Sequence, residues 1–217
     1  MPENMFNIIL IIHIGSGFTA LLCGLFAIVA KKGKPMHRNA GKIFFIAMIV
    51  VAVSAIFMSV AHRSMFLFTI GIFAFFQDYF GYRAIKNKSM KPSAFDWVVL
   101  VLAAVNSILM ISTFQIVLMV FGGISASLAY GVFRTFLLTS KDKEIPKKSW
   151  LALHIGMMLG AYIATSTAFL VVNIKTFQPS WLPWLIPTIL GVPLIFYYTN
   201  KFTGKKPRPV FTRSEHA

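Results

Sequence analysis

Acidic residues and cysteine are scarce in this chain of 217 residues. Only 6 residues are Asp or Glu, and charged residues of both signs make up 12% of the chain, against about 25% in ordinary soluble domains. A soluble globular domain is therefore excluded. A disordered chain is excluded as well, because 57% of the residues are hydrophobic. The one cysteine, Cys23, cannot form a disulfide within the chain, and it excludes the multi-cysteine sites of zinc knuckles and iron–sulfur clusters.

Long hydrophobic runs are what the sequence has instead. A helix needs about 20 mostly apolar residues to cross the hydrocarbon core of a bilayer, and its backbone groups must be satisfied within the helix. Seven runs meet this requirement, at roughly 6–30, 43–62, 65–82, 97–112, 115–138, 150–173 and 183–200. The sequence predicts an all-α integral membrane protein with seven transmembrane helices in one domain, residues 1–200, followed by a basic tail, residues 201–217. The uncharged turn between the fourth and fifth runs predicts a tight hairpin, and Pro187 and Pro193 predict a kink in the last helix.

The basic residues predict how the helices are oriented. The chain holds 21 Lys and Arg and has a formal net charge of +15, and all of these residues except Arg63 and Lys175 fall in alternate loops or in the tail. By the positive-inside rule, the N-terminus is outside and the C-terminus and tail are cytoplasmic. This distribution explains the high positive charge, so nucleic-acid binding is not needed to account for it. The expected partners are the lipid bilayer and anionic lipid at the cytoplasmic face, and the sequence leaves a homo-oligomer open.

Ionisable side chains at membrane depth are costly, so each one is a functional candidate. His13 and His62 are expected near the outer face. His37, in the loop before the second span, and His154, about one turn into the sixth span, are expected near the cytoplasmic face. Asp78, the one acidic residue inside a predicted span, is expected at the same level as His37 and His154.

Two pairs of histidines favour haem as the leading hypothesis. A b-type haem needs two axial imidazoles and cations near its propionates. The residues of the two candidate sites are His13, His62 and Arg63 for an outer haem, and His37, Arg38 and His154 for an inner haem. Two haems placed in this way would carry electrons between the two faces of the membrane. The leading hypothesis is therefore a haem-binding transmembrane redox protein.

Three alternatives remain open at this stage. His37, Asp78 and His154 form a two-imidazole, one-carboxylate set that suits a zinc or iron ion in a metal-dependent membrane enzyme. A small-molecule transporter could use the same side chains. In a structural or assembly protein without its own chemistry, the histidines would bind backbone carbonyls, and Asp78 would pair with Arg38, Arg83 or Arg134.

Other classes of seven-span protein are excluded by missing residues. The seventh run holds no lysine before Lys201, so it cannot form the Schiff base of a retinal protein. No span carries the spaced arginines of a voltage sensor. The seventh run also has no histidine, whereas zinc hydrolases of the adiponectin-receptor and alkaline-ceramidase type have a paired HxxxH there.

Several short motifs point to a family. They are His13-Ile-Gly-Ser-Gly17, Ala20-Leu-Leu22, Gly24, Lys32-Gly33, His37-Arg38-Asn-Ala-Gly41, Met48, Phe80-Gly-Tyr-Arg83, His154 to Met158, Gly160-Ala-Tyr-Ile-Ala164 and Thr167-Ala-Phe169. Over about the first 170 residues the chain resembles bacterial predicted membrane proteins grouped as domain of unknown function 2306. The resemblance implies a multi-pass protein of the bacterial inner membrane and carries no agreed activity. The histidine pairs near both faces also resemble, more loosely, the ascorbate-reducible di-haem b-type cytochromes, whose ligands lie within spans, unlike the position expected for His37.

Overall fold

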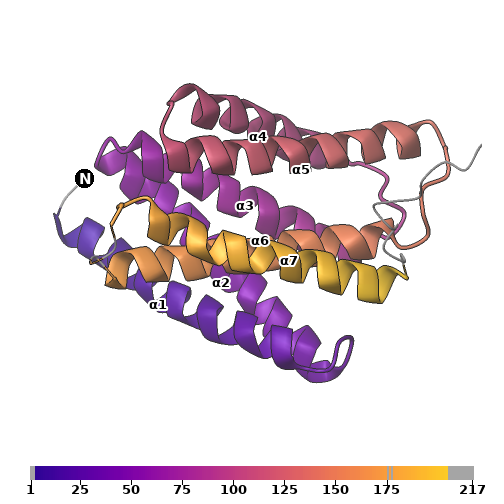
Figure 1. The fold of residues 1–217 in the computed structure, drawn as a ribbon, viewed down its shortest axis with the longest axis horizontal. Coiled ribbons are helices and arrows are strands. Elements are labelled where there is room, and N and C mark those ends of the chain that lie inside the picture. The colour runs from indigo at the N-terminus through magenta and orange to yellow at the C-terminus, as the bar shows by residue number, and fades with distance from the viewer. Residues whose placement is uncertain (1–2, 175, 177, 205–217) are drawn as a thin grey trace, which may run out of the picture.

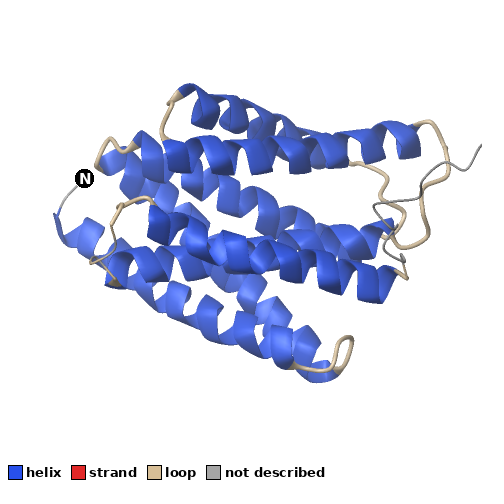
Figure 2. Cartoon of the chain, in the orientation of Figure 1, coloured by secondary structure: helices blue, strands red, loops and turns tan. Residues whose placement is uncertain are grey.

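Seven helices make up the described part of the chain, which contains no strand (Figures 1 and 2). The computed structural model describes residues 3–174, 176 and 178–204. The helices are α1 (Glu3–Val29), α2 (Pro35–Ala61), α3 (Met65–Lys86), α4 (Ala94–Ser112), α5 (Ile116–Ser140), α6 (Ser149–Asn173) and α7 (Leu182–Thr203). Each is long and apolar enough to cross a membrane, so the seven-helix prediction is confirmed. The predicted side of each terminus stays a prediction, and residues 205–217 of the expected tail lie outside the described part.

Local signals in the loops place the helix ends. Pro35 is at the first position of α2, where its missing N–H costs nothing and its fixed φ suits a helix. His37 therefore lies in the first turn of α2, and the expectation that it lies in a loop is wrong. Hydropathy did not predict this first helical turn, because its basic residues lower the mean hydropathy just before the hydrophobic run. At the other end of the chain, α7 contains Pro187 and Pro193 and ends at Gly204, whose φ of +77° is the left-handed conformation that favours glycine.

The most buried helix, α3, lies at the centre of the bundle. It packs against α2 on one side, α6 on another and the α4–α5 pair on a third. Helix α1 pairs with α2, and α7 packs on α6. In Figure 1 the α4–α5 hairpin runs along one edge, α1 and α2 form the opposite edge, and α3 and α6 lie between them. The tight hairpin predicted for the fourth and fifth runs is confirmed, since only residues 113–115 separate these helices.

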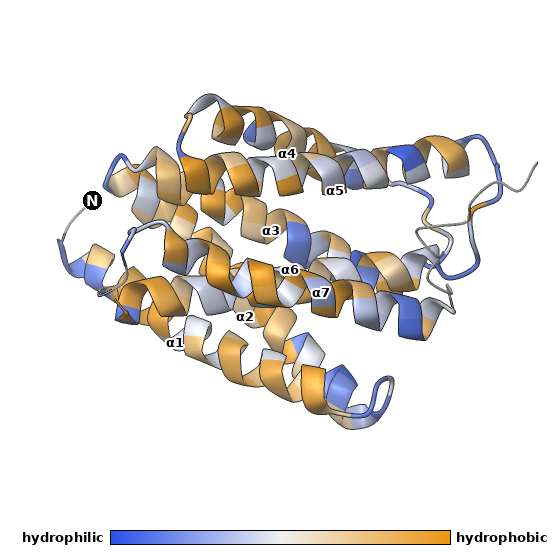
Figure 3. Cartoon of the chain, in the orientation of Figure 1, coloured by the Kyte–Doolittle hydropathy of each residue, from blue (hydrophilic) through white to orange (hydrophobic). Residues whose placement is uncertain are grey.

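The outer surface of the bundle is apolar along its middle. Ile11, Ile108 and Leu190, which lie on three different helices, are 66–69% exposed. Figure 3 shows hydrophobic residues along the helices and hydrophilic residues in the loops. This pattern fits a surface that faces lipid. We call the end that carries the α1–α2, α3–α4 and α5–α6 loops and the last turn of α7 the basic end.

Candidate functional site

A pocket of about 660 Å³ lies at the basic end, between α1, α2, α3, α6 and α7. Its volume falls within the range of about 300–1,000 Å³ that small-molecule and cofactor sites occupy. The aromatic side chains that line it are Phe44, Tyr82, Trp150, Tyr162, Tyr198 and Phe202. The basic side chains that line it are Lys32, Arg38, Lys42, Lys86 and Lys88. A group that is flat and apolar but carries negative charge at one edge would suit this lining.

Two of the predicted histidines meet in this pocket. His37 of α2 and His154 of α6 have ring centroids 6.5 Å apart and ring planes at 90° to each other. The Nδ1 atom of His37 is 2.8 Å from the carbonyl oxygen of Ala27, and that of His154 is 2.8 Å from the carbonyl oxygen of Gly81. A carbonyl oxygen only accepts hydrogen bonds, so each Nδ1 carries the proton and donates. Each Nε2 is then left with a free lone pair, as in histidines that bind metals.

Glycine in α3 brings His154 to its carbonyl partner. A Cβ atom added to Gly81 would lie 3.2 Å from Cβ of Met157, which is tighter than ordinary contact. The missing side chain therefore lets α6 approach α3 closely. Gly24 of α1 plays a similar part, because a Cβ there would lie 2.7 Å from Cε2 of Tyr162. These two glycines thus help to position one wall of the pocket.

The lysines around the pocket are held by aromatic rings and by helix ends. The ammonium of Lys88 lies 4.9 Å from the ring centroid of Trp150, and that of Lys32 lies 5.5 Å from the ring centroid of Tyr198. Lys32 also donates to the carbonyl oxygens of Ala27, at 3.1 Å, and Ile28, at the C-terminal end of α1. Burial lowers the pKa of the Lys32 ammonium from its ordinary value. These contacts keep positive charge beside the two histidines.

The outer histidines are not brought together. His13 on α1 contacts the hydroxyl of Ser54 on α2, with Nδ1 and Oγ 2.9 Å apart. His62 and Arg63 lie exposed in the turn between α2 and α3, and the His62 ring packs edge-on against Phe6 with centroids 4.6 Å apart. Phe6 precedes His13 by about two helical turns, roughly 10 Å along α1. The expected outer site of His13, His62 and Arg63 is therefore not assembled, because α2 ends nearer the start of α1 than the level of His13.

Asp78 is buried on α3 apart from any cation. Its exposed fraction is 0%, and neither carboxylate oxygen has a hydrogen-bond partner among the described residues. Within residues 3–174, 176 and 178–204, no three His, Cys, Asp or Glu side chains gather closely enough to hold a metal ion. The structure therefore does not assemble His37, Asp78 and His154 into one metal site. Arg83, one of the three arginines considered as a partner for Asp78, binds another carboxylate.

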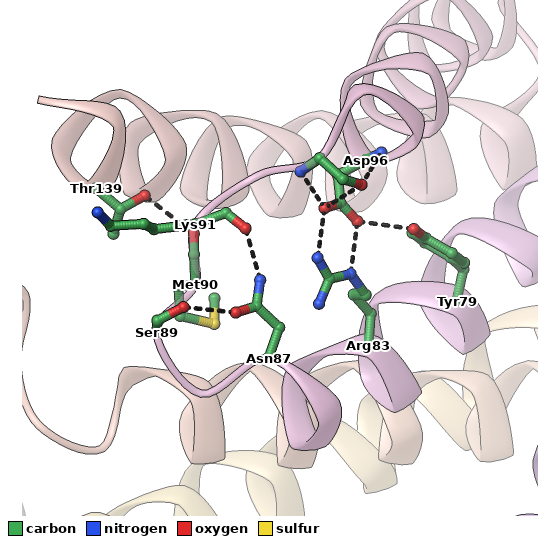
Figure 4. Close-up of polar contacts among 9 residues, drawn as sticks. Tyr79, Arg83, Asn87, Ser89, Met90, Lys91, Asp96 and Thr139 are labelled. Carbon is green, nitrogen blue, oxygen red and sulfur yellow. Dashed lines mark hydrogen bonds and ion pairs between the residues drawn. The ribbon is translucent and has the colours of Figure 1, made fainter.

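That carboxylate belongs to Asp96, which lies just before the predicted fourth span, residues 97–112. Asp96 is 0% exposed in the first turn of α4, and it accepts hydrogen bonds from Arg83 Nε at 3.0 Å, from Arg83 Nη2 at 2.9 Å and from the Tyr79 hydroxyl at 2.7 Å (Figure 4). It also forms a capping box with Ser93. The Ser-x-x-Asp spacing before an apolar run is the signal that could have placed this residue. The pair holds α4 to α3 beside the pocket rather than inside it.

The comparison with family models gives one match. A model described as a predicted membrane protein, DUF2306, matches residues 10–141, which is more than half of the chain. The chain belongs to this family. The matched stretch contains His37 and Asp78 and ends before His154, so it is shorter than the resemblance over about 170 residues that the motifs suggested. No curated protein and no solved structure matches the chain. Membership of DUF2306 and the seven apolar helices make this a multi-pass membrane protein.

Proposed function

We propose that this DUF2306 protein binds one haem b in the pocket at the basic end, with His37 and His154 as the two axial ligands. The observation that carries the proposal is the pair of imidazoles that share a pocket while both Nδ1 atoms bind carbonyl oxygens. In the neutral ring this arrangement leaves Nε2 of each histidine available to bind a metal. Two imidazoles that bound one metal ion between them, each through a bond of about 2.0 Å, would have ring centroids about 6.2 Å apart. The observed separation is 6.5 Å.

The rest of the pocket supports a macrocycle better than a bare metal ion. Two imidazoles alone leave a metal ion short of protein ligands, since zinc sites use at least three. A porphyrin supplies four nitrogens of its own, so two histidines are enough. The aromatic lining suits its faces, and the cations of Arg38 and Lys42 suit its carboxylates. Small-molecule transport has no comparable observation in its favour.

The geometry favours electron transfer by a single haem. When bound, haem supplies a one-electron carrier, and two histidine ligands leave no open position for oxygen or substrate on the iron. The chain's own residues hold the group, shield its faces from water and neutralise its carboxylates. Because His13 and His62 are apart, we propose one haem at the basic end rather than two across the membrane.

An absorption spectrum tests the proposal. The protein is produced in haem-supplied cells, purified in detergent and compared with four single variants. We expect a Soret band that sharpens on reduction with dithionite, and one haem per chain. His37→Ala and His154→Ala should lose it, whereas His13→Ala and His62→Ala should keep it. Absence of the band in the natural protein would refute haem binding, and the two histidines would then serve to hold α2 to α1 and α6 to α3.

A further inference from the structure

Asp78 differs from the other carboxylate buried in the bundle. Both Asp78 and Asp96 are 0% exposed. Asp96 accepts five hydrogen bonds of 2.7–3.0 Å from Tyr79, Arg83 and Ser93. Neither oxygen of Asp78 has a partner among the described residues. Buried carboxyl groups without partners are rare because each costs several kcal/mol, about 2–7 for a neutral polar group and far more for an ion.

The position of Asp78 links it to the pocket. Residues three and four apart share a face of a helix. Asp78 therefore lies on the same face of α3 as Gly81, whose carbonyl holds His154, and Tyr82, which lines the pocket. It also lies on the face of Ala74, which is packed in the core that α1, α2 and α6 form with α3. The carboxyl is thus about one helical turn, roughly 5 Å, deeper than the pocket wall.

The environment of Asp78 favours its neutral form. No cation of the described residues pairs with it. The core that contains Ala74, on the same face of α3, is made of alanine, methionine and phenylalanine side chains, with Cys23 and Tyr162 packed against it. An ionised carboxylate in such a place is costly enough that the group binds a proton instead. A neutral carboxyl can still lose its proton when positive charge arrives nearby.

We propose that Asp78 is a proton-binding site, protonated when the pocket is empty and connected to water through the pocket at the basic end. If the pocket holds the haem proposed above, the site acquires a second role that rests on that proposal. One electron from a one-electron reductant removes one positive charge from the pocket, and one proton from water then binds the Asp78 carboxylate. Loss of positive charge from the pocket and uptake of a proton by Asp78 would therefore accompany each other.

The titratable groups of the pocket and of the core beside this face of α3 are mostly basic. They are Cys23 of α1, His37 of α2, Tyr82 of α3, His154 and Tyr162 of α6, and the pocket cations Lys32, Arg38, Lys42, Lys86 and Lys88. All of these cations line the pocket. Positive charge there attracts a carboxylate and opposes a proton, so the proton on Asp78 is sensitive to what fills the pocket.

Infrared spectroscopy on the purified, haem-free protein tests the proton site. We expect the carbonyl stretch of a protonated carboxyl at pH 7, its shift in D₂O, and its loss in Asp78→Asn. The matched control, Asp142→Asn, removes an exposed carboxylate and should keep the band. A band that survives in Asp78→Asn, or is missing from the natural protein, overturns the proposal. A band that does not shift in D₂O overturns the connection to water through the pocket.

Two further measurements separate this proposal from protein misfolding and from the haem proposal. Asp78→Asn should be about as stable as the natural protein, because a neutral carboxyl and an amide have the same shape and neither carries a charge. If haem is bound, the midpoint potential should fall by about 59 mV per pH unit, the one-electron equivalent of a tenfold change, and Asp78→Asn should flatten this slope. A flat slope in the natural protein overturns the coupling. Absence of haem leaves the infrared result to decide the proton site alone.

Discussion

Changing Asp96 to asparagine should destabilise the bundle strongly, in contrast to the same change at Asp78. Asn keeps the shape of the side chain and replaces one accepting oxygen with an NH₂ donor. That donor then faces groups that also donate, namely the Arg83 guanidinium, the Tyr79 hydroxyl and the backbone N–H of Ser93. The α3–α4 connection and the N-terminus of α4 are expected to loosen.

The magnitude follows from two losses. Removing one partner of a buried ion pair costs about 3–5 kcal/mol, because it leaves a buried charge without its partner. The cost here is at the lower end, since the Arg83 side chain is 26% exposed and water can reach it. Loss of the capping box between Ser93 and Asp96 costs roughly 0.5–2 kcal/mol, part of which overlaps with the first loss. We expect a total of about 3–4 kcal/mol, or roughly 6–16 °C in Tm for a chain of this size.

Thermal unfolding in detergent, followed by circular dichroism, measures this effect. Asp142→Asn is the control, because its carboxylate is exposed and pairs only with exposed Lys91. The double variant Arg83→Met with Asp96→Asn should lose less stability than the sum of the two single variants, since neither charge is then left alone. If Asp96→Asn melts like Asp142→Asn, the ion pair does not hold α3 to α4 and the reasoning is refuted.

Two other predictions concern helix packing and orientation. A Cβ at Gly122 would lie 2.9–3.1 Å from atoms of α4, one of them a backbone oxygen, whereas at Gly123 no atom of the described residues lies within 4 Å. Gly122→Ala should therefore cost about 1–3 kcal/mol in thermal unfolding and Gly123→Ala should cost nothing; equal losses would contradict the packing of the hairpin. In a Cys23→Ser background, Ser89→Cys should react with a membrane-impermeant thiol reagent only from the cytoplasmic side, and Arg63→Cys only from outside. Labelling from the opposite sides would mean that the bundle is inverted.

Sequence alone predicted the number and nature of the helices. Hydrophobic length and the need to satisfy backbone groups in lipid are local properties, and each can be read from about 20 consecutive residues. The same holds for the α4–α5 hairpin, which depends on a short uncharged connection. His37 was misplaced into a loop because Pro35, a local signal for a helix start, was outweighed by the charges around it.

Which side chains meet was decided by tertiary structure. His37 and His154 share a pocket because α2 and α6 both pack on α3 and because Gly81 lets α6 approach closely. His13 and His62, which were both expected near the outer face, remain apart because helix pairing sets the lateral and axial position of each residue. Arg83 pairs with Asp96 and not with Asp78 for the same reason, since α4 brings Asp96 to it while Asp78 is buried without a partner among the described residues. Hydropathy reports depth in the membrane, whereas contacts between side chains depend on how helices rotate and pack against their neighbours.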